Sequence, residues 1–515
     1  MLTYIGNFAL IINKMPTEFM KPLRLVFSLL CIISLYPKIA AQTVIDDIIY
    51  SVDTLTMTAQ VSDYQNSPID VVIPPTIEYS GDMYSVTKIG RKAFNQCTSL
   101  KSLEIPNSVI EIDKSAFSNC NSLESLVLVS GKSRLDGASQ SGLTSCPIRS
   151  MYIGRYIGGE SIINKDSIRN LTIAGNADYP KLHGCTSLQS VTIESSKSYI
   201  AYEAFWGCTG LTSIDIPNSV TEIGGKAFYG CTGLTSIDIP NSVTKINGST
   251  FYNCTGLTRI DIPNSVTSIG PNVFRGCTGL TRVDIPNSVT SIGSTAFQGC
   301  TSLTSIDIPN SVTEILGAVF HGCTGLKSIV IPNSVNELQG TFSGCTGLTN
   351  IVIPNSVDEI GSHTFYGCRS LASIDIPISV NEIDDYTFYG CTSLKSIVIP
   401  KSVAEIKLYA FGDCTGLKSI TCLPSTPPQL DRRNFSDEQY SNIPLYVPED
   451  AISAYQAADY WKNFKNIKAI ETSGIESLEL KEGDVLHVIY DLKGRRLREK
   501  QKGLNIINGE KVLER

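Results

Sequence analysis

The chain is poor in the residues that most catalytic and metal sites use. Its 515 residues include only 2 tryptophans, 6 methionines and 4 histidines. The sequence has no C-x-x-C pair, no recognisable nucleophile motif and no phosphate-binding glycine loop. We therefore expect no enzyme, no cofactor and no zinc site. The four histidines, His183, His321, His363 and His487, are scattered along the chain, and we interpret His321 and His363 as exposed residues of the variable arc.

Basic charge is also scarce. Lys and Arg total 42 against 49 Asp and Glu, which gives a formal net charge of -7 at pH 7. Proteins that bind nucleic acid usually carry a basic face, so we expect no nucleic-acid partner. A net negative charge of this size mainly favours solubility, and nothing in the composition indicates a state other than a monomer.

Long apolar runs are missing outside the N-terminal region. There, Lys21 and Arg24 precede an apolar run over 25–35, and small residues at 39–41 offer a cleavage point. This three-part pattern is typical of a secretory signal peptide and is too short for a membrane span. We predict that residues 1–41 are removed, that the protein is exported to the cell surface or beyond, and that no membrane-spanning segment remains.

The start of this leader stays open, and a lipid-anchored form is an alternative to its cleavage. Translation can start at Met1 or at Met20. Cys31 raises the alternative of a lipid-anchored protein, but the bulky Leu30 precedes it and it lies inside the apolar run. We therefore favour cleavage over lipid attachment.

Between about residue 82 and residue 421 the chain repeats one pattern every 23 residues. A fixed period of this length indicates a solenoid, in which each coil buries its apolar side against its neighbours. The repeat predicts one elongated domain with a continuous core. The string Ile-Pro-Asn-Ser-Val starts at Ile105, Ile216, Ile239, Ile262, Ile285, Ile308, Ile331 and Ile353, with variants at Ile376 and Ile399.

A single coil shows how the pattern folds. Leu211, Ile214 and Ile216 follow L-x-x-L-x-L spacing, so a short strand with an aliphatic inner side is predicted. Pro217 cannot donate to a sheet and ends the strand. An irregular arc then returns to the next coil. One coil lacks a residue between Leu338 and Phe342, and we expect the strand row to continue past it, because an arc absorbs such changes.

Phenylalanine and cysteine recur once per coil. We interpret the phenylalanines as a stacked core spine rather than a sugar-binding platform, since each sits beside the small residue that closes its coil. They are Phe94, Phe117, Phe205, Phe228, Phe251, Phe274, Phe297, Phe320, Phe342, Phe365, Phe388 and Phe411. From Cys208 to Cys414 the cysteines keep the same period, with one 22-residue step. Parallel stacked side chains do not favour the Cβ separation of a disulfide, so we predict buried free thiols.

The ends and one inner segment depart from the repeat. We predict an N-terminal cap over 42–81 with a half-buried strand from Leu55 to Val61, and the solenoid over 82–423. Within it, irregular, longer coils span 121–184 and include strands over 148–153 and 168–173. A C-terminal cap over 424–471 contains a helix from Pro448 through Tyr460, on which Ile452 and Tyr455 face the last coil. A separate β module spans 472–515, with a strand over 485–490 and a hairpin at Asn508-Gly509.

The residues resemble the BspA-like leucine-rich repeat family of bacterial surface proteins over about 43–471. The resemblance rests on Ala-Phe-x-x-Cys-x-x-Leu, the L-x-x-I-x-I strand and the Ile-Pro-x-Ser-Val turn. Residues 485–513, with Tyr490-Asp491-Leu492-x-Gly494-Arg495, resemble the C-terminal sorting domain of type IX secretion in Bacteroidetes. The resemblance implies a leucine-rich repeat fold, export to the cell surface and, for some members, adhesion to host matrix or plasma proteins. It implies no catalytic residues.

The outward-facing residues of the strands are the candidate binding surface, because the inward-facing residues of the repeat are needed for packing. Nearly identical groups in successive coils suit a repetitive partner, such as a fibrous protein or a polysaccharide, by multivalency. The alternatives are a display spacer without a ligand and a calcium-binding row of carboxylates, although one acid per coil is sparse for calcium. The candidate residues are Ser213, Asp215, Ser236, Asp238, Arg259, Asp261, Arg282, Asp284, Ser305 and Asp307.

Overall fold

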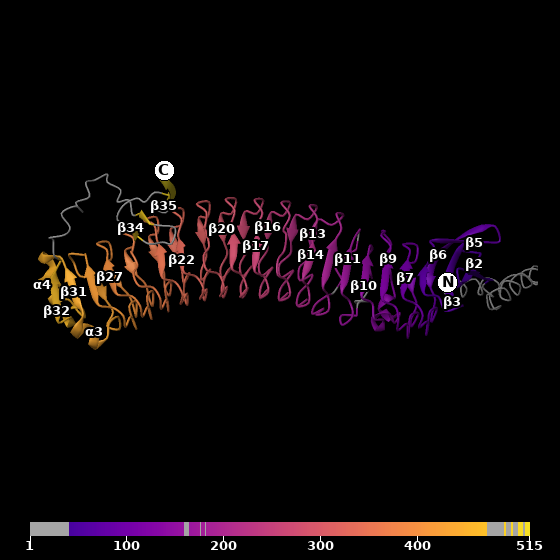
Figure 1. Cartoon of the computed structure of the whole chain (residues 1–515), viewed down its shortest axis with the longest axis horizontal. Helices are drawn as coiled ribbons and strands as arrows, with labels where there is room; N and C mark the ends of the chain where they lie inside the picture. The colour runs from indigo at the N-terminus through magenta and orange to yellow at the C-terminus, as the bar shows by residue number, and fades with distance from the viewer. Residues whose placement is uncertain are drawn as a thin grey trace, which may run out of the picture.

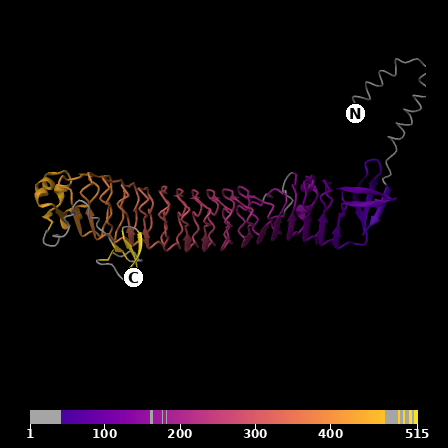
Figure 2. The same cartoon turned by 90° about the horizontal axis from the view of Figure 1, so that it is seen from above.

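Stacked coils form one long, gently curved rod (Figure 1), which the view from above also shows (Figure 2). The computed structural model describes residues 41–514 apart from 159–163, 176, 181, 471–488, 491–495, 498–502 and 508–509. The predicted leader and Cys31 lie outside the described residues. The rod is the predicted leucine-rich repeat solenoid of coils of about 23 residues, with a β-rich region at one end and short helices at the other.

The first row of parallel strands follows the L-x-x-I-x-I segment of the repeat. In β7 and β9, Leu103 pairs with Leu126 and both side chains are buried, while the intervening residues face outward. The row contains β4 (Asp70–Val72), β7 (Ser102–Ile105), β9 (Ser125–Leu128), β10 (Ser150–Ile153), β11 (Asn170–Ile173), β12 (Ser190–Ile193), β14 (Ser213–Asp215), β17 (Arg259–Asp261), β19 (Arg282–Asp284), β22 (Ser328–Val330), β24 (Asn350–Val352), β27 (Ser396–Ile399), β29 (Ser419–Cys422), β31 (Pro444–Val447) and β32 (Asn466–Ala469).

The shortened coil does not interrupt this row. Ser328 pairs with Asn350 and Val330 with Val352, so β22 and β24 stay in register across the 22-residue step. The expectation that the arc absorbs the missing residue is confirmed.

A second row of two-residue strands runs along the arc, which the sequence was expected to leave irregular. The repeated Glu-Ile or Ser-Ile pair forms it, with the isoleucine buried and paired to its counterpart one coil away. It comprises β8 (Glu111–Ile112), β13 (Tyr199–Ile200), β15 (Glu222–Ile223), β16 (Lys245–Ile246), β18 (Ser268–Ile269), β20 (Ser291–Ile292), β21 (Glu314–Ile315), β23 (Glu337–Leu338), β25 (Glu359–Ile360), β26 (Glu382–Ile383), β28 (Glu405–Ile406) and β30 (Gln429–Leu430). Pairs this short carry too little alternation to be recognised in sequence.

The phenylalanines form the predicted buried spine. Neighbouring rings such as Phe228 and Phe251 lie parallel with centroids 5.5 Å apart, and both side chains are fully buried. Tyr64 extends the spine at the N-terminal end, with its centroid 6.1 Å from that of Phe94. Phe435 extends it at the other end, 5.8 Å from Phe411. The spine is therefore core packing, and rings from both caps continue it.

Each ladder cysteine is a buried free thiol, as predicted, and it also makes a hydrogen bond that the sequence did not reveal. The Cys254 thiol donates to the carbonyl oxygen of Phe228 at 3.0 Å, and that oxygen also accepts from the backbone N–H of Cys231 at 3.1 Å. One carbonyl thus uses both of its lone pairs, one within its coil and one toward the next. Burial raises the pKa of the Cys231 and Cys277 thiols to about 12.

The coil between these elements turns sharply just before each cysteine. Gly276 there has φ +74°, in the left-handed region that glycine adopts at little cost. Asn253 replaces it one coil earlier with φ +55°, consistent with the tolerance of asparagine for this conformation. The turn therefore requires a left-handed residue before the cysteine, and glycine is the residue that most coils use there.

The irregular segment 121–184 contains the two predicted strands, β10 and β11, but its coils are not all longer. Ser125 pairs with Ser150, Ser150 with Asn170, and Asn170 with Ser190. One long coil is therefore followed by two short ones, and the expectation of uniformly longer coils is wrong. The Gly-rich stretch folds into two short 3-10 helices, η1 (Ala138–Gln140) and η2 (Leu143–Ser145).

The N-terminal region is a small sheet, and its predicted strand begins later than expected. Leu55 is 78% exposed in the turn between two strands, and Met57 has a left-handed φ of 54°. Only Ala59 and Val61 are buried, within β3. The alternation of apolar residues thus runs across a hairpin turn into the strand. The sheet contains β1 (Ala41–Ile45), β2 (Ile48–Asp53), β3 (Thr58–Tyr64), β5 (Thr76–Tyr79) and β6 (Asp82–Ile89), and β6 also pairs with β8 at the start of the second row.

At the C-terminal end the motif stops but the stacking continues. β29 pairs with β31, and β31 pairs with β32, so two further coils follow Thr421. The helix predicted from Pro448 through Tyr460 is shorter in the structure: η3 (Glu449–Ala451) runs into α4 (Ile452–Ala457), which ends because Ala458 is extended. A separate turn, η4 (Trp461–Asn463), follows Tyr460, which has a positive φ of 61°. Tyr455 does face the last coils, and its hydroxyl donates to the Pro424 carbonyl at 2.8 Å.

A short helix that the sequence analysis did not identify precedes these elements. α3 (Asp437–Asn442) is stabilised by a capping box, in which Ser436 accepts from the Gln439 N–H and the Gln439 side chain accepts from the Ser436 N–H. The Ser-x-x-Gln signal was visible in the sequence.

The C-terminal module is described only as backbone strands. These are β33 (Ile489–Tyr490), β34 (Arg496–Leu497), β35 (Gly503–Ile507) and β36 (Glu510–Glu514). Ile507 pairs with Glu510 in an antiparallel arrangement, which confirms the predicted hairpin. The remainder of the strand predicted over 485–490 lies outside the described residues.

The thiol ladder predicts a loss of stability at alkaline pH. The folded protein holds thiols such as Cys277 protonated up to about pH 12, whereas unfolded thiols ionise near their ordinary value of 9.0. Raising the pH from 9 to 12 therefore favours unfolding, by about 1.4 kcal/mol per pH unit for each such thiol. Thermal melts under reducing conditions at pH 7, 9 and 10 measure this. A midpoint that does not fall between pH 9 and 10 would contradict it.

Candidate functional site

The ten candidate residues lie exposed along one face of the first strand row. Asp261 and Asp284 pair across β17 and β19, and single bridges join Asp238 to Asp261 and Asp284 to Asp307. All ten side chains are exposed while the isoleucine or valine between each pair points inward. The structure therefore brings the predicted residues together as a column that repeats once per coil.

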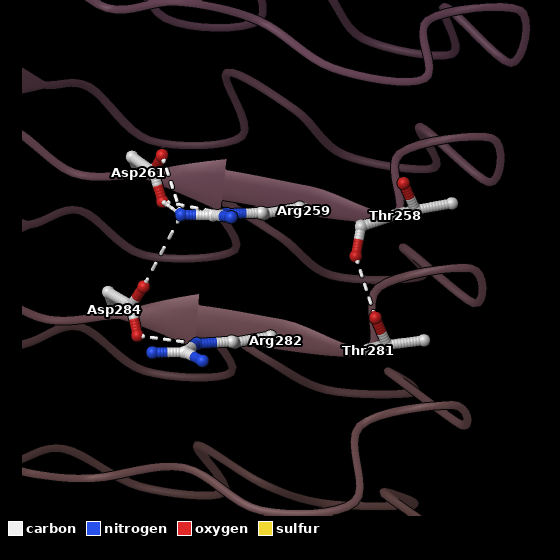
Figure 3. Close-up of polar contacts among 6 residues, drawn as sticks. All are labelled: Thr258, Arg259, Asp261, Thr281, Arg282 and Asp284. Carbon is white, nitrogen blue, oxygen red and sulfur yellow. Dashed lines mark hydrogen bonds and ion pairs between the residues drawn. The ribbon is translucent and has the colours of Figure 1, made fainter.

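Two arginines link the carboxylates of this column (Figure 3). Arg259 contacts both carboxylate oxygens of Asp261, at 3.0 and 3.1 Å, and its Nη2 lies 3.9 Å from Asp284 in the next coil. Arg282 donates to Asp284 at 2.8 Å, and this hydrogen bond raises the pKa of its guanidinium. The arginines offset repulsion between stacked acids, and all four side chains remain 47–69% exposed.

The neighbouring threonine and serine side chains of the repeat make hydrogen bonds within the protein. The Thr281 hydroxyl donates to the Thr258 carbonyl at 3.0 Å (Figure 3), and the same contact joins Thr258 to Thr235 at 3.2 Å. The serine of the Ile-Pro-Asn-Ser-Val turn behaves alike: Ser288 donates to the Val266 carbonyl at 2.6 Å. These hydroxyls connect coils, so the column of ten remains the outward polar surface of the strand row.

The second row carries stacked glutamates. Glu337 pairs with Glu359, and the pKa of Glu359 is raised, first by burial and then by the charges of Glu337 and Asp384. Among the residues that the structure describes, no group of three or more His, Cys, Asp or Glu is arranged to hold a metal ion. The calcium hypothesis therefore has no preformed site in the described part of the chain.

Aromatic columns on the arc were missed by the sequence analysis. The residue after most spine phenylalanines is at least partly exposed; the exceptions are Ser343, which is buried, and Gly412, which has no side chain. Where two such residues in successive coils are tyrosines, their rings stack: the ring centroids of Tyr229 and Tyr252 are 4.5 Å apart, and those of Tyr366 and Tyr389 are 5.2 Å apart. The signal is present in the sequence as Phe-Tyr-Gly-Cys.

The histidines do not form a joint site in the described chain. His183 meets Trp206 edge-on, at 5.3 Å between centroids, and His363 stacks on Tyr386 at 5.0 Å. His321 follows Phe320 and, like His183, stands directly before a Gly-Cys pair, the position of the aromatic column, while His487 is outside the described residues. His363 lies two residues before Phe365, in a second row that continues with Tyr386 and Tyr409.

Comparison with known proteins agrees with the coil geometry. The model of the BspA type Leucine rich repeat region matches residues 82–179, 179–300, 245–341 and 338–442. No curated protein is similar enough to count as a match. A leucine-rich repeat protein from Bacteroides ovatus ATCC 8483 is 28% identical, with a TM-score of 0.53, over 83% of this chain and 100% of that chain. This likeness supports the fold.

Two further solved structures are more distant. A leucine rich cell surface protein from Faecalibacterium prausnitzii A2-165 is 24% identical over 84% of this chain and 96% of its own, with a TM-score of 0.33. The pneumococcal vaccine antigen PcpA is 17% identical over 84% and 100%, with a TM-score of 0.37. Within the described residues, no helix has the length and apolar character needed to cross a membrane.

Arg259 should contribute to stability through charge. Replacing Arg259 with Gln leaves Asp261 without its nearest cation, so the melting temperature should fall slightly at low ionic strength and recover toward wild type in about 1 M salt, where such charges are screened. Arg369→Gln, an exposed arc position, is the matched control. A decrease of equal size at both ionic strengths would show that the arginine stabilises by packing instead.

Proposed function

This chain belongs to the BspA-type leucine-rich repeat family, and we propose that it is an exported surface protein that binds a repetitive protein or glycan through its strand face. The observation that carries the proposal is the in-register column of exposed polar residues on consecutive coils, which includes Arg259, Asp261, Arg282 and Asp284. The matching family is a repeat region and not a catalytic one.

Spacing supports a repetitive partner. Paired strands lie about 4.8 Å apart, so the same donors and acceptors recur at that interval along the rod. Each contact can be weak, because a partner with its own repeat engages several coils at once and the contacts reinforce one another. A host matrix or plasma protein and a polysaccharide both have such repetition.

The charges of the column also suit binding. Each coil of the column presents an exposed aspartate together with an arginine in the coils of β17 and β19 or a serine in the others, which supplies hydrogen-bond donors and acceptors in one stripe. A surface of both signs does not favour nucleic acid, whose backbone requires a basic face. The competing proposal of a display spacer rests on the same geometry, since Arg259 and Arg282 already occupy the carboxylates.

The proposed location rests on the two ends of the sequence. Residues 1–41 have the pattern of a secretory signal, and residues 472–515 resemble a type IX sorting domain of Bacteroidetes. We infer that the first directs export from the cytoplasm and that the second directs the protein to the cell surface. The described solenoid, 82–423, and the caps at 42–81 and 424–471 would then be displayed outside the cell.

Charge reversal on the strand face tests the proposal. The protein is screened on immobilised matrix proteins, plasma proteins and polysaccharides, and Asp238→Lys with Asp261→Lys should weaken any interaction at this face at least about tenfold. Glu314→Lys with Glu337→Lys changes the net charge equally on the second strand row and serves as the control.

Two outcomes would contradict the proposal. Binding that both double variants retain would place the ligand elsewhere, with the irregular coils 121–184 as the next candidate. No binding across the panel would favour the display spacer.

A further inference from the structure

The outward face of the first strand row changes its charge along the rod. Five successive coils of the column of ten each present an aspartate, beginning with Asp215 in β14. In the three coils before it, β10 to β12, the equivalent outward residues are Tyr152, Thr172 and Thr192, which the strand register places in line with Asp215. This part of the strand face, in the N-terminal half of the rod (Figure 1), therefore has no carboxylate at that position.

Two arginines stand directly before β10 and β11, one coil apart. The backbone N–H of Arg169 donates to the carbonyl oxygen of Arg149 at 2.8 Å, so the two residues occupy the same place in successive coils, and both side chains are exposed. Paired strands lie about 4.8 Å apart, and like charges opposite each other on neighbouring strands are destabilising. The fold thus concentrates positive charge here against its own stability.

Only one of the two guanidinium groups has a counter-charge. Nη2 of Arg149 lies 3.8 Å from Oε1 of Glu124 in the preceding coil, and both side chains are more than half exposed. Among the residues that the structure describes, none forms an ion pair or a hydrogen bond with the Arg169 side chain. The next coil presents the neutral Gln189, whose backbone N–H donates to the Arg169 carbonyl at 2.8 Å. The N–H donors of Arg169 are therefore available to a ligand.

The arginines of the column of ten provide an internal comparison. Arg259 and Arg282 donate to Asp261 and Asp284, each two residues further along the same strand. A guanidinium group can hold an anion through two parallel N–H donors. The column uses this capacity within the protein, whereas Arg169 leaves it unused.

The surface beside the two arginines carries hydroxyl and amide groups. Ser150 pairs with Asn170, and Asn170 pairs with Ser190. The Ser190 hydroxyl donates to Oδ1 of Asn170 at 2.7 Å, which leaves the amide N–H groups of the exposed Asn170 as donors. The hydroxyls of Tyr152 and Ser130 are 2.9 Å apart. Such neutral donors and acceptors suit the hydroxyls of sugars.

Carboxylates limit this surface on both sides. Glu104 and Glu124 belong to the two coils before it, and Asp215 begins the aspartates after it. Asp166, three residues before Arg169, is also exposed. A densely charged polyanion such as nucleic acid would meet these acids on either side of the arginines and be repelled. A polymer whose anionic groups are separated by neutral units avoids this repulsion.

We propose that Arg149 and Arg169 bind an acidic polysaccharide, holding the carboxylate or sulfate of one sugar while neighbouring sugars lie on the hydroxyl and amide face of β10 to β12. The bound anion offsets the repulsion between the two arginines and supplies Arg169 with a partner. This site goes beyond the strand-face function proposed above and does not depend on it, because it uses none of the ten residues of the column.

The experiment uses the protein from Gln42 to Arg515 and calorimetry at neutral pH and low salt. The probes are short oligomers of hyaluronan, which carries carboxylates, of chondroitin sulfate, which carries carboxylates and sulfates, of neutral dextran and of single-stranded DNA. At least one acidic saccharide should bind, and dextran should not. The binding should weaken in about 0.5 M salt, where exposed charges are screened. Binding of hyaluronan assigns the site to carboxylates, and binding of chondroitin sulfate alone assigns it to sulfates.

Paired substitutions locate the site. Arg149→Gln with Arg169→Gln should weaken binding about tenfold or more, because each lost hydrogen bond involves a charged group. Arg259→Gln with Arg282→Gln is the matched control: it removes the same charge from the same strand row, but from arginines that already bind aspartates, so binding should stay at the wild-type level. If melting shows that the first pair does not fold, Arg169→Gln alone decides, since its side chain has no partner to lose in the described chain.

Four results would overturn the proposal. Neither acidic saccharide binds, or the variant without Arg149 and Arg169 binds as tightly as the wild type. Equal or greater loss in the control pair would assign the anion to the column of ten. DNA that binds more tightly than either saccharide, and that depends on the same two arginines, would show that the partner is a nucleic acid.

Discussion

The shared carbonyl of each spine phenylalanine is the contact on which the stacking of coils depends. It accepts the N–H of the cysteine in its own coil and the thiol of the cysteine in the next, as the Phe228 carbonyl does with Cys231 and Cys254. A thiol is a weak donor, and the carbonyl keeps the backbone N–H of its own coil as a second partner, so a single contact contributes little to stability. Because the contact recurs from coil to coil, it keeps equivalent residues above one another, in the same register as the stacked rings and both strand rows.

This register explains why so much of the repeat is unavailable for binding. The cysteine, the phenylalanine, the left-handed glycine, and the hydroxyls of Thr281 and Ser288 all join one coil to another. Only the few side chains of each coil that point outward are available for ligand recognition. On the strand row these are the aspartates with their neighbouring serines or arginines, and on the arc they are most of the residues that follow the spine phenylalanines. One surface is repetitive and the other varies from coil to coil.

The sequence predicted the parts of this structure that repetition reveals. Ten or more copies of one pattern identify Ile214 and Phe228 as inward and Asp215 as outward, because a residue that recurs at one period occupies one place in the coil. The structure confirmed the exposed column, and its binding role stays a prediction.

Features that occur once were harder to predict. The turns at Met57 and at Tyr460 require a positive φ, which the local sequence does not predict. Gly412 is needed because a Cβ there would clash with the rings of Tyr389 and Tyr409, and this reason appears only when the coils are stacked. Such a contact joins residues one coil apart, so it becomes visible only once the stacking is known.

Counting thiols in the native and the unfolded protein tests the central claim most directly. The chain from Gln42 contains the fifteen described cysteines, all free and buried. Without reductant, a thiol reagent at neutral pH should label essentially none of them in the folded protein and all fifteen after denaturation. Ready labelling of the folded protein, or fewer than fifteen thiols after denaturation, would show that the cysteines are exposed or paired in disulfides and would contradict the stacked ladder.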